Sequence, residues 1–136
     1  MAAALAGIAV AACLLAWAIY MYPFLTRQRA MTATMAPLLN EARSLKITYE
    51  SVLAFPYQTI GKPAVWCIQK PEQGRIYYRG DMNKKIMEDS PGEIPLFVGG
   101  KHSACTDMLV IIKGVKTNTV GGYKAAFVSI QFVSQI

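Results

Sequence analysis

The first 22 residues contain no charged side chain, and this feature constrains the fold of the chain more than any other. Residues 2–22 read AAALAGIAVAACLLAWAIYMY, which as a helix is about 31 Å long and matches the hydrocarbon core of a bilayer. Aromatic residues cluster at its C-terminal end, where their rings favour the headgroup region, and Pro23 follows. The sequence therefore predicts a transmembrane helix within residues 1–25.

Two other interpretations of this segment fit less well. A cleaved signal peptide has a basic start, a shorter apolar run and a small-x-small cleavage site, whereas this segment begins with alanines and ends in bulky residues. Val10 to Cys13 resembles a lipoprotein cleavage box, but a further apolar run follows Cys13 and no basic residue precedes it. We therefore favour a retained helix over cleavage or lipidation.

Small residues recur every four positions in this helix, at Ala3, Gly7 and Ala11. Because apolar lipid gives little hydrophobic drive for helices to associate, such stripes let a second helix approach closely and gain van der Waals contact. The alternative is that alanine is simply common here. The stripe predicts a partner among integral-membrane protein subunits.

The formal net charge of +6 is uneven, because residues 26–46 form a basic connector. Basic residues near an anionic leaflet each contribute about 1 kcal/mol of binding, so the connector is predicted to contact anionic lipid headgroups at the membrane surface. The positive-inside rule would place the following domain in the cytoplasm. Apolar residues at helical spacing also predict a short helix from Pro37 onward. The basic residues are Arg27, Arg29, Arg43 and Lys46.

Cys67 and Cys105 argue for the opposite orientation. They are the only cysteines outside the apolar segment, and an isolated pair in a small exported domain commonly forms a disulfide. We favour this signal, which places the C-terminal domain on the periplasmic side of an inner (cytoplasmic) membrane as part of a single-pass protein.

Residues 47–136 alternate between short apolar runs and turn residues, which predicts a mainly β domain with helices. Thr48 is suited to cap a helix over Tyr49–Ala54, and Ile47 and Val52 have the spacing of a hydrophobic staple. Residues 81–92 and 116–122 are predicted loops. Five short strands suit a small closed barrel, since an open sheet would expose its edges. The predicted strands are 64–69, 75–79, 94–98, 108–113 and 123–135.

The order of these motifs resembles the small exported OB-fold-like barrels of bacteria. A short helix precedes Ile60-Gly61-Lys62-Pro63-Ala64-Val65-Trp66-Cys67, then come Ile76-Tyr77-Tyr78-Arg79-Gly80 and Cys105 before Met108-Leu109-Val110-Ile111-Ile112. The resemblance covers residues 48–134. It implies a five-stranded OB-like barrel used for binding or for holding assemblies together rather than for chemistry.

Catalytic chemistry has few candidate residues in this chain. With one histidine, His102, no two-histidine metal motif can form. His102, Cys105 and Asp107 with Cys67 supply zinc-type ligands at a spacing that matches no established pattern. Activation of Cys105 by His102 would need a thiolate, which a disulfide forbids. We therefore predict no catalytic residue, metal or cofactor, and a protein that is not an enzyme.

The most promising binding residues lie on the first two predicted strands: Trp66, Arg75, Tyr77 and Arg79. On an OB-like barrel these strands carry aromatic and basic side chains that contact polymers. Strand alternation sends Tyr77 and Tyr78 to opposite faces, so at least one of them belongs to the core. No nucleic acid is expected outside the cytoplasm.

Two functions are consistent with these features. The first is a non-enzymatic accessory subunit that packs one transmembrane helix into a larger photosynthetic, respiratory or secretory complex and braces its exported face. The alternative is a membrane-anchored binding module that recognises a polymer or peptide through its barrel face.

Overall fold

The computed structural model describes the backbone of residues 2–99 and 105–136, and their side chains except at residues 2–12, 24–32 and 120. The chain divides into two compact units, Met1–Pro37 and Leu38–Ile136. Helix α1 (Ala2–Leu45) accounts for the described residues of the first unit and continues into the second. The remaining elements are the short helices α2 (Tyr49–Ala54) and α3 (Pro56–Thr59) and five strands.

The predicted N-terminal transmembrane helix is wrong. No helix in the described part of the chain is long and apolar enough to cross a membrane. The sequence also predicts that this helix lies within residues 1–25 and is followed by a separate connector. Instead α1 continues through Pro23 and Pro37, so the apolar segment and the basic connector share one helix.

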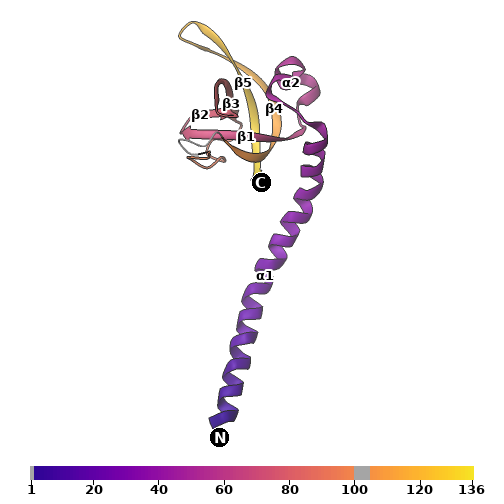
Figure 1. Ribbon diagram of the computed structural model, residues 1–136, viewed down its shortest axis with the longest axis vertical. Coiled ribbons are helices and arrows are strands. Elements are labelled where there is room, and N and C mark those ends of the chain that lie inside the picture. The colour runs from indigo at the N-terminus through magenta and orange to yellow at the C-terminus, as the bar shows by residue number, and fades with distance from the viewer. Residues whose placement is uncertain (1, 100–104) are drawn as a thin grey trace. The chain divides into compact units, whose positions relative to one another are not determined.

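The five strands of the second unit form a closed barrel in the order β1-β2-β3-β5-β4 (Figure 1). Neighbouring strands are antiparallel except β3 and β5, which run parallel. The mainly β fold with short helices is as predicted, and the closed barrel is compatible with a small OB-like domain. The strands are β1 (Pro63–Glu72), β2 (Arg75–Tyr78), β3 (Asp81–Glu88), β4 (Thr106–Val120) and β5 (Tyr123–Gln135).

Three segments differ from the sequence prediction. Residues 116–122 are a predicted loop, but β4 continues to Val120 and only Gly121 and Gly122 form the turn. β3 lies where the sequence predicts a loop. Only Ile86 of this strand is fully buried, so its sequence, DMNKKIME, carries a weak apolar signal. The predicted strand 94–98 is reduced to a single bridge between Val98 and Lys70. The Glu88 carboxylate accepts the backbone N–H groups of Gly92 and Ile94, at 3.1 and 2.6 Å, so these donors are not used in a ladder.

The Glu88 carboxylate also forms a buried ion pair. The Lys70 ammonium lies 3.0 Å from both carboxylate oxygens and donates to the Ile94 carbonyl at 2.7 Å. Lys70 is 2% exposed, and a buried charge is tolerated only when paired and hydrogen-bonded. The pair therefore fixes the loop that follows β3 against the barrel.

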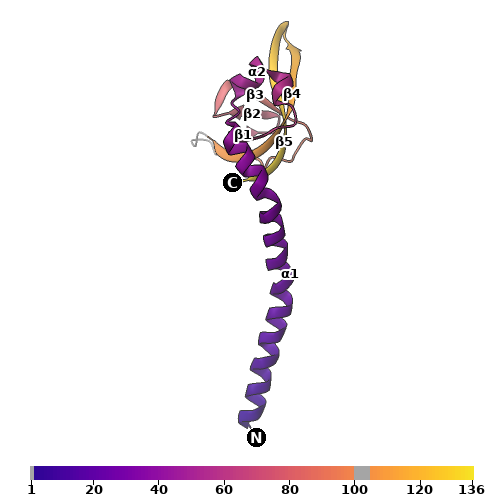
Figure 2. The same cartoon turned by 90° about the vertical axis from the view of Figure 1, so that its right-hand side faces the viewer.

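Helix α2 covers one end of the barrel (Figures 1 and 2). Thr48 caps it as predicted: its hydroxyl accepts from the Ser51 N–H, and the Ser51 hydroxyl accepts from the Thr48 N–H. Val52 and Tyr49 then point into the same core as Trp66, and Ile47 packs against it. Local capping thus sets the helix so that its apolar face closes the barrel.

Candidate functional site

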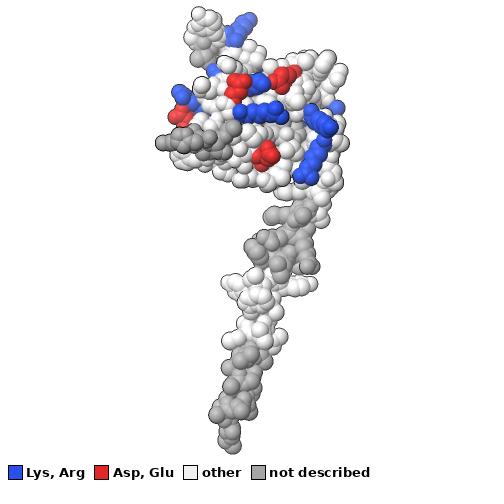
Figure 3. All heavy atoms as spheres, viewed as in Figure 1, with Lys and Arg blue, Asp and Glu red and all other residues white. Residues whose placement is uncertain are grey.

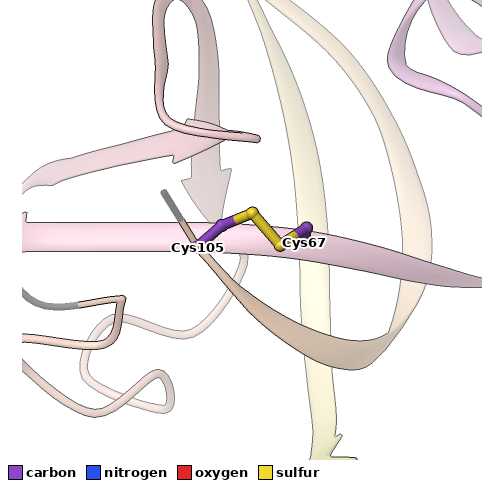
Figure 4. The surroundings of a disulfide bond; sticks show 2 residues. All are labelled: Cys67 and Cys105. Carbon is purple, nitrogen blue, oxygen red and sulfur yellow. A yellow bond between two sulfur atoms is a disulfide. The ribbon is translucent and has the colours of Figure 1, made fainter. Parts of the chain in front are cut away.

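The predicted disulfide between Cys67 and Cys105 is present (Figure 4). Cys67 lies in β1 and Cys105 immediately precedes β4, with a Cα–Cα distance of 5.2 Å. Residue 67 is paired with Asp107 across the β1–β4 ladder, which brings the two chain segments together. Since both sulfurs are bonded to each other, neither cysteine offers a thiolate for catalysis or metal binding.

Trp66, which was predicted for a ligand face, lies in the core and is 1% exposed. Its indole N–H donates to the Ile47 carbonyl at 2.7 Å. Its ring lies 6.1 Å from that of Tyr49 and 5.1 Å, edge-on, from that of Tyr78. These contacts use both the apolar ring and its polar atom inside the domain, so Trp66 has no surface for stacking a ligand.

The other predicted ligand residues separate into two places. Tyr78 is buried and Tyr77 is half-buried on the opposite face, as alternation requires. Arg79 is exposed in the turn after β2, with its guanidinium carbon 5.3 Å from the centre of the Tyr78 ring. Arg75 and Tyr77 instead line a surface groove.

This groove, here called the β2–β3 groove, has a volume of about 150 Å³. Tyr77 faces Lys85 across the β2–β3 ladder, and the Lys85 ammonium lies 5.7 Å from the centre of the Phe127 ring. Arg75 and Tyr77 are among the residues predicted from the sequence, but Lys85 and Phe127 are not, because the sequence predicts a loop at residues 81–92 and β5 is distant in sequence. The lining residues are Gly74, Arg75, Ile76, Tyr77, Lys85, Ile86 and Phe127.

The groove combines cations with aromatic rings. The Arg75 guanidinium forms an ion pair with the Glu72 carboxylate at 2.6 Å, and both side chains are exposed to water. Lys85 is half-buried and lies against a ring face, an arrangement in which a cation gains stabilisation without an acidic partner. Such a lining suits an anionic ligand or one that presents a flat apolar group.

A second surface is formed by large apolar side chains around the two short helices. We call it the α2–α3 corner: Leu53, Phe55, Tyr57 and Ile60, which are 41 to 91% exposed. The corner results from the local sequence, because the α2 cap directs Tyr49 and Val52 inward and Pro56 then starts α3. A hollow of about 220 Å³ adjoins it, with Phe55, Lys46 and Lys62 among its lining residues.

Charged residues near α2 are partly paired. The Lys84 ammonium contacts the Glu50 carboxylate, and this hydrogen bond holds the pKa of Glu50 below its usual value and raises the pKa of Lys84. Figure 3 shows positive and negative side chains interspersed on the visible face of the barrel unit, with positive ones also on the hairpin that β4 and β5 form. The ion pair between Lys84 and Glu50 joins β3 to α2 at the surface of the domain.

Several predicted site residues remain untested. The side chains of Ala3, Gly7, Ala11, Arg27 and Arg29 lie outside the described residues, as does His102. Arg43 and Lys46 are exposed, and their contact with lipid headgroups stays a prediction. Among the residues that the structure describes, no group of three or more His, Cys, Asp or Glu side chains is placed to hold a metal ion.

Comparison of the chain with family models, with curated proteins and with solved structures found no match. The β2–β3 groove and the α2–α3 corner are therefore the features that indicate a function.

Proposed function

We propose that this chain is a non-enzymatic accessory subunit that docks onto a larger protein assembly through the α2–α3 corner. The observation that carries the proposal is the exposure of four large apolar side chains within eight residues of sequence, with Tyr57 91% and Phe55 58% exposed. Soluble monomers rarely leave a contiguous apolar patch in water, and such patches usually mark interaction sites. Aromatic residues at the centre of a docking surface also contribute most of its binding energy.

The charge around the corner indicates the partner's chemistry. Lys46 and Lys62 line the adjoining hollow, and both are exposed. An apolar partner surface with an acidic rim would match the corner in shape and charge, and charge complementarity selects the partner and orients it. The Cys67–Cys105 disulfide supports an oxidising, exported compartment for this assembly, as the resemblance to exported bacterial barrels implies.

The test is to purify the full chain from its native source under mild conditions and measure the mass of the complex. A stoichiometric partner is expected with the native chain. Replacing Phe55 and Tyr57 by serine should release this partner without lowering the thermal midpoint, because neither side chain is in the core.

Tyr123→Ser is the matched control, since Tyr123 is 82% exposed but lies away from the corner in sequence and on β5. This variant should retain the partner. Purification of the native chain as a lone monomer, or equal loss of the partner in both variants, would contradict a docking role for the corner.

The second candidate function is a binding module that recognises an anionic peptide or polymer. The observation that favours it is the β2–β3 groove, in which Lys85 lies against Phe127 beside Tyr77 and Arg75. The binding module would use a different surface from the α2–α3 corner, so mutations can distinguish the two functions. Tyr77→Ser should weaken ligand binding and leave the assembly partner in place.

A further inference from the structure

The β4–β5 hairpin has a free edge next to the β2–β3 groove. β5 pairs with β4 from Tyr123 onward, but it pairs with β3 only over Val128–Ile130. Within the described strands, the segment 123–127 is therefore hydrogen-bonded on one side. In both views the hairpin extends beyond the rest of the barrel (Figures 1 and 2).

The register shows which backbone groups of this segment face outward. Gly121 and Gly122, with φ of 60° and 84°, form the two-residue turn between Val120 and Tyr123. Residues that flank a two-residue turn form a hydrogen-bonded pair, and hydrogen-bonded and non-hydrogen-bonded pairs then alternate along an antiparallel ladder. Lys124 and Ala126 thus direct their N–H and C=O groups away from β4.

An independent hydrogen bond agrees with this assignment. The Ile130 carbonyl accepts the N–H of Asp89, which directly follows β3, at 2.8 Å. The one register shift in this stretch adds a residue to β4, between Ile112 and Gly114, and none to β5, so residue 130 shares its direction with residues 124 and 126. The unpaired groups of Lys124 and Ala126 consequently lie on the β3 side of β5.

The free edge leads into the groove. Lys85, Ile86 and Phe127 line the groove, and Ile86 and Val128 form the first pair of the parallel β3–β5 ladder. The groove therefore lies where β3 and β5 separate. An extended segment bound along residues 124–126 would reach the Lys85 ammonium and the Phe127 ring at this fork.

The charges along the edge distinguish a partner peptide from a second copy of the chain. Lys124 is exposed on the edge itself, and Lys85 lies at the fork. Lysine on an edge strand disfavours pairing between identical chains, because their positive charges would be brought together. The same lysines favour a strand with acidic side chains.

We propose that the free edge of β5 binds an extended, acidic peptide segment of a partner protein by β-strand addition. Backbone hydrogen bonds to Lys124 and Ala126 would supply affinity, and Lys85 with Phe127 would select a segment that carries acidic and apolar side chains. This inference rests on the second candidate function, since it names the ligand class of the β2–β3 groove.

Two synthetic ten-residue peptides with a fluorescent label provide the probe, one alternating Glu and Val and the other alternating Lys and Val. Fluorescence anisotropy with the full chain should detect binding of the Glu peptide alone. Ala126→Pro removes the outward N–H and should weaken this binding about tenfold, while the β4–β5 ladder and the thermal midpoint are retained. Lys85→Ala should also weaken it, and more at low salt than at high salt.

Lys113→Ala is the matched charge control, because Lys113 is exposed on β4 and lines neither the groove nor the hollow beside the α2–α3 corner, and it should leave peptide binding unchanged. Equal binding of both peptides, or full binding by Ala126→Pro with a native thermal midpoint, would overturn strand addition. So would self-association through the hairpin, detected by sedimentation.

An acidic oligosaccharide, tested in the same binding assay, distinguishes failure of strand addition from failure of the binding-module function on which it rests. Binding of the oligosaccharide, but not of the Glu peptide, overturns strand addition and retains the groove as an anion site. Failure of both to bind removes the groove function as well, and leaves the α2–α3 corner to its own test.

Discussion

The end of the barrel under α2 and the β4–β5 hairpin both contain aromatic residues, but they use them in opposite ways. Under α2, Tyr49 and Trp66 are almost fully buried, and the polar atom of each is hydrogen-bonded to a backbone carbonyl. On the hairpin, Tyr123 is 82% exposed. The covered end removes apolar surface from water, whereas the hairpin leaves it accessible.

The two regions therefore differ in what their side chains contribute to the domain. Burial of an aromatic side chain with its polar atom satisfied stabilises the folded state directly. An exposed ring and a one-sided ladder contribute little to folding, but they keep contacts available to a partner. Substitutions at the covered end should therefore change stability, and substitutions along the free edge of the hairpin should change binding of the extended peptide.

The largest effect is expected for Trp66→Ala. Removing a fully buried Trp costs about 3 to 5 kcal/mol, and this change also leaves the Ile47 carbonyl without its donor. A domain of this size has about 5 to 10 kcal/mol of total stability, so most of it would be lost. Urea unfolding followed by circular dichroism measures the change.

Trp66→Phe is the comparator, because it keeps an aromatic ring in the core but removes the indole N–H. Its cost should be clearly smaller than that of Trp66→Ala. If Trp66→Ala instead unfolds at the native urea concentration, the covered end is not where the stability of the domain is concentrated.

The next largest loss of stability is expected when the disulfide is removed. Cys67 and Cys105 are 38 residues apart, and closing a loop of that length stabilises a domain by about 4 kcal/mol in the chain-entropy estimate. The double variant Cys67→Ser/Cys105→Ser should lose roughly this amount, as should the native chain in reductant. After denaturation without reductant, a thiol reagent should label Cys13 alone. Labelling of all three cysteines would exclude the bond.

Much of the fold was predictable because it depends on local signals. The Thr48 cap and the Ile47–Val52 spacing predicted α2 with its observed bounds, and the apolar run at 108–113 predicted the buried part of β4. β3 gives no such signal, because only Ile86 among its residues is fully buried and its sequence therefore carries little apolar periodicity. The N-terminal segment shows the opposite failure, since an apolar run was taken for a membrane span.

The candidate sites were predictable only in part. Alternation correctly separated Tyr77 from Tyr78, but it does not tell which face is covered by another element. Trp66 was therefore grouped with ligand residues, although α2 and the Ile47 carbonyl enclose it. Lys85 and Phe127 meet only through the parallel β3–β5 pairing, a long-range contact that leaves no local pattern.

A smaller effect, with a characteristic pH dependence, is expected for Tyr49. Burial raises the pKa of its hydroxyl, which donates to the Lys85 carbonyl at 3.0 Å. Because the folded pKa lies above the unfolded one, this contribution is fully present below about pH 10 and is lost as pH rises through the folded pKa. Tyr49→Phe should cost about 1 kcal/mol at neutral pH and reduce the alkaline loss of stability. Equal slopes for both proteins between about pH 9 and pH 11 would exclude Tyr49 as its source.

The smallest effect is expected for Tyr123→Ser on the hairpin, where the free energy of unfolding should stay within about 0.5 kcal/mol of the native value. Tyr123 is next to the Gly121–Gly122 turn and is 82% exposed, so its ring has little buried area to lose. Tyr49→Ser provides the contrast, because it removes the same kind of ring from a buried position at the covered end. The free energy of unfolding of both variants is measured at two protein concentrations, because a dependence on concentration reports self-association. A loss of 2 kcal/mol in Tyr123→Ser that grows with concentration would mean that the hairpin is covered by a second copy in solution, and the division between a stabilising end and a binding end would then fail.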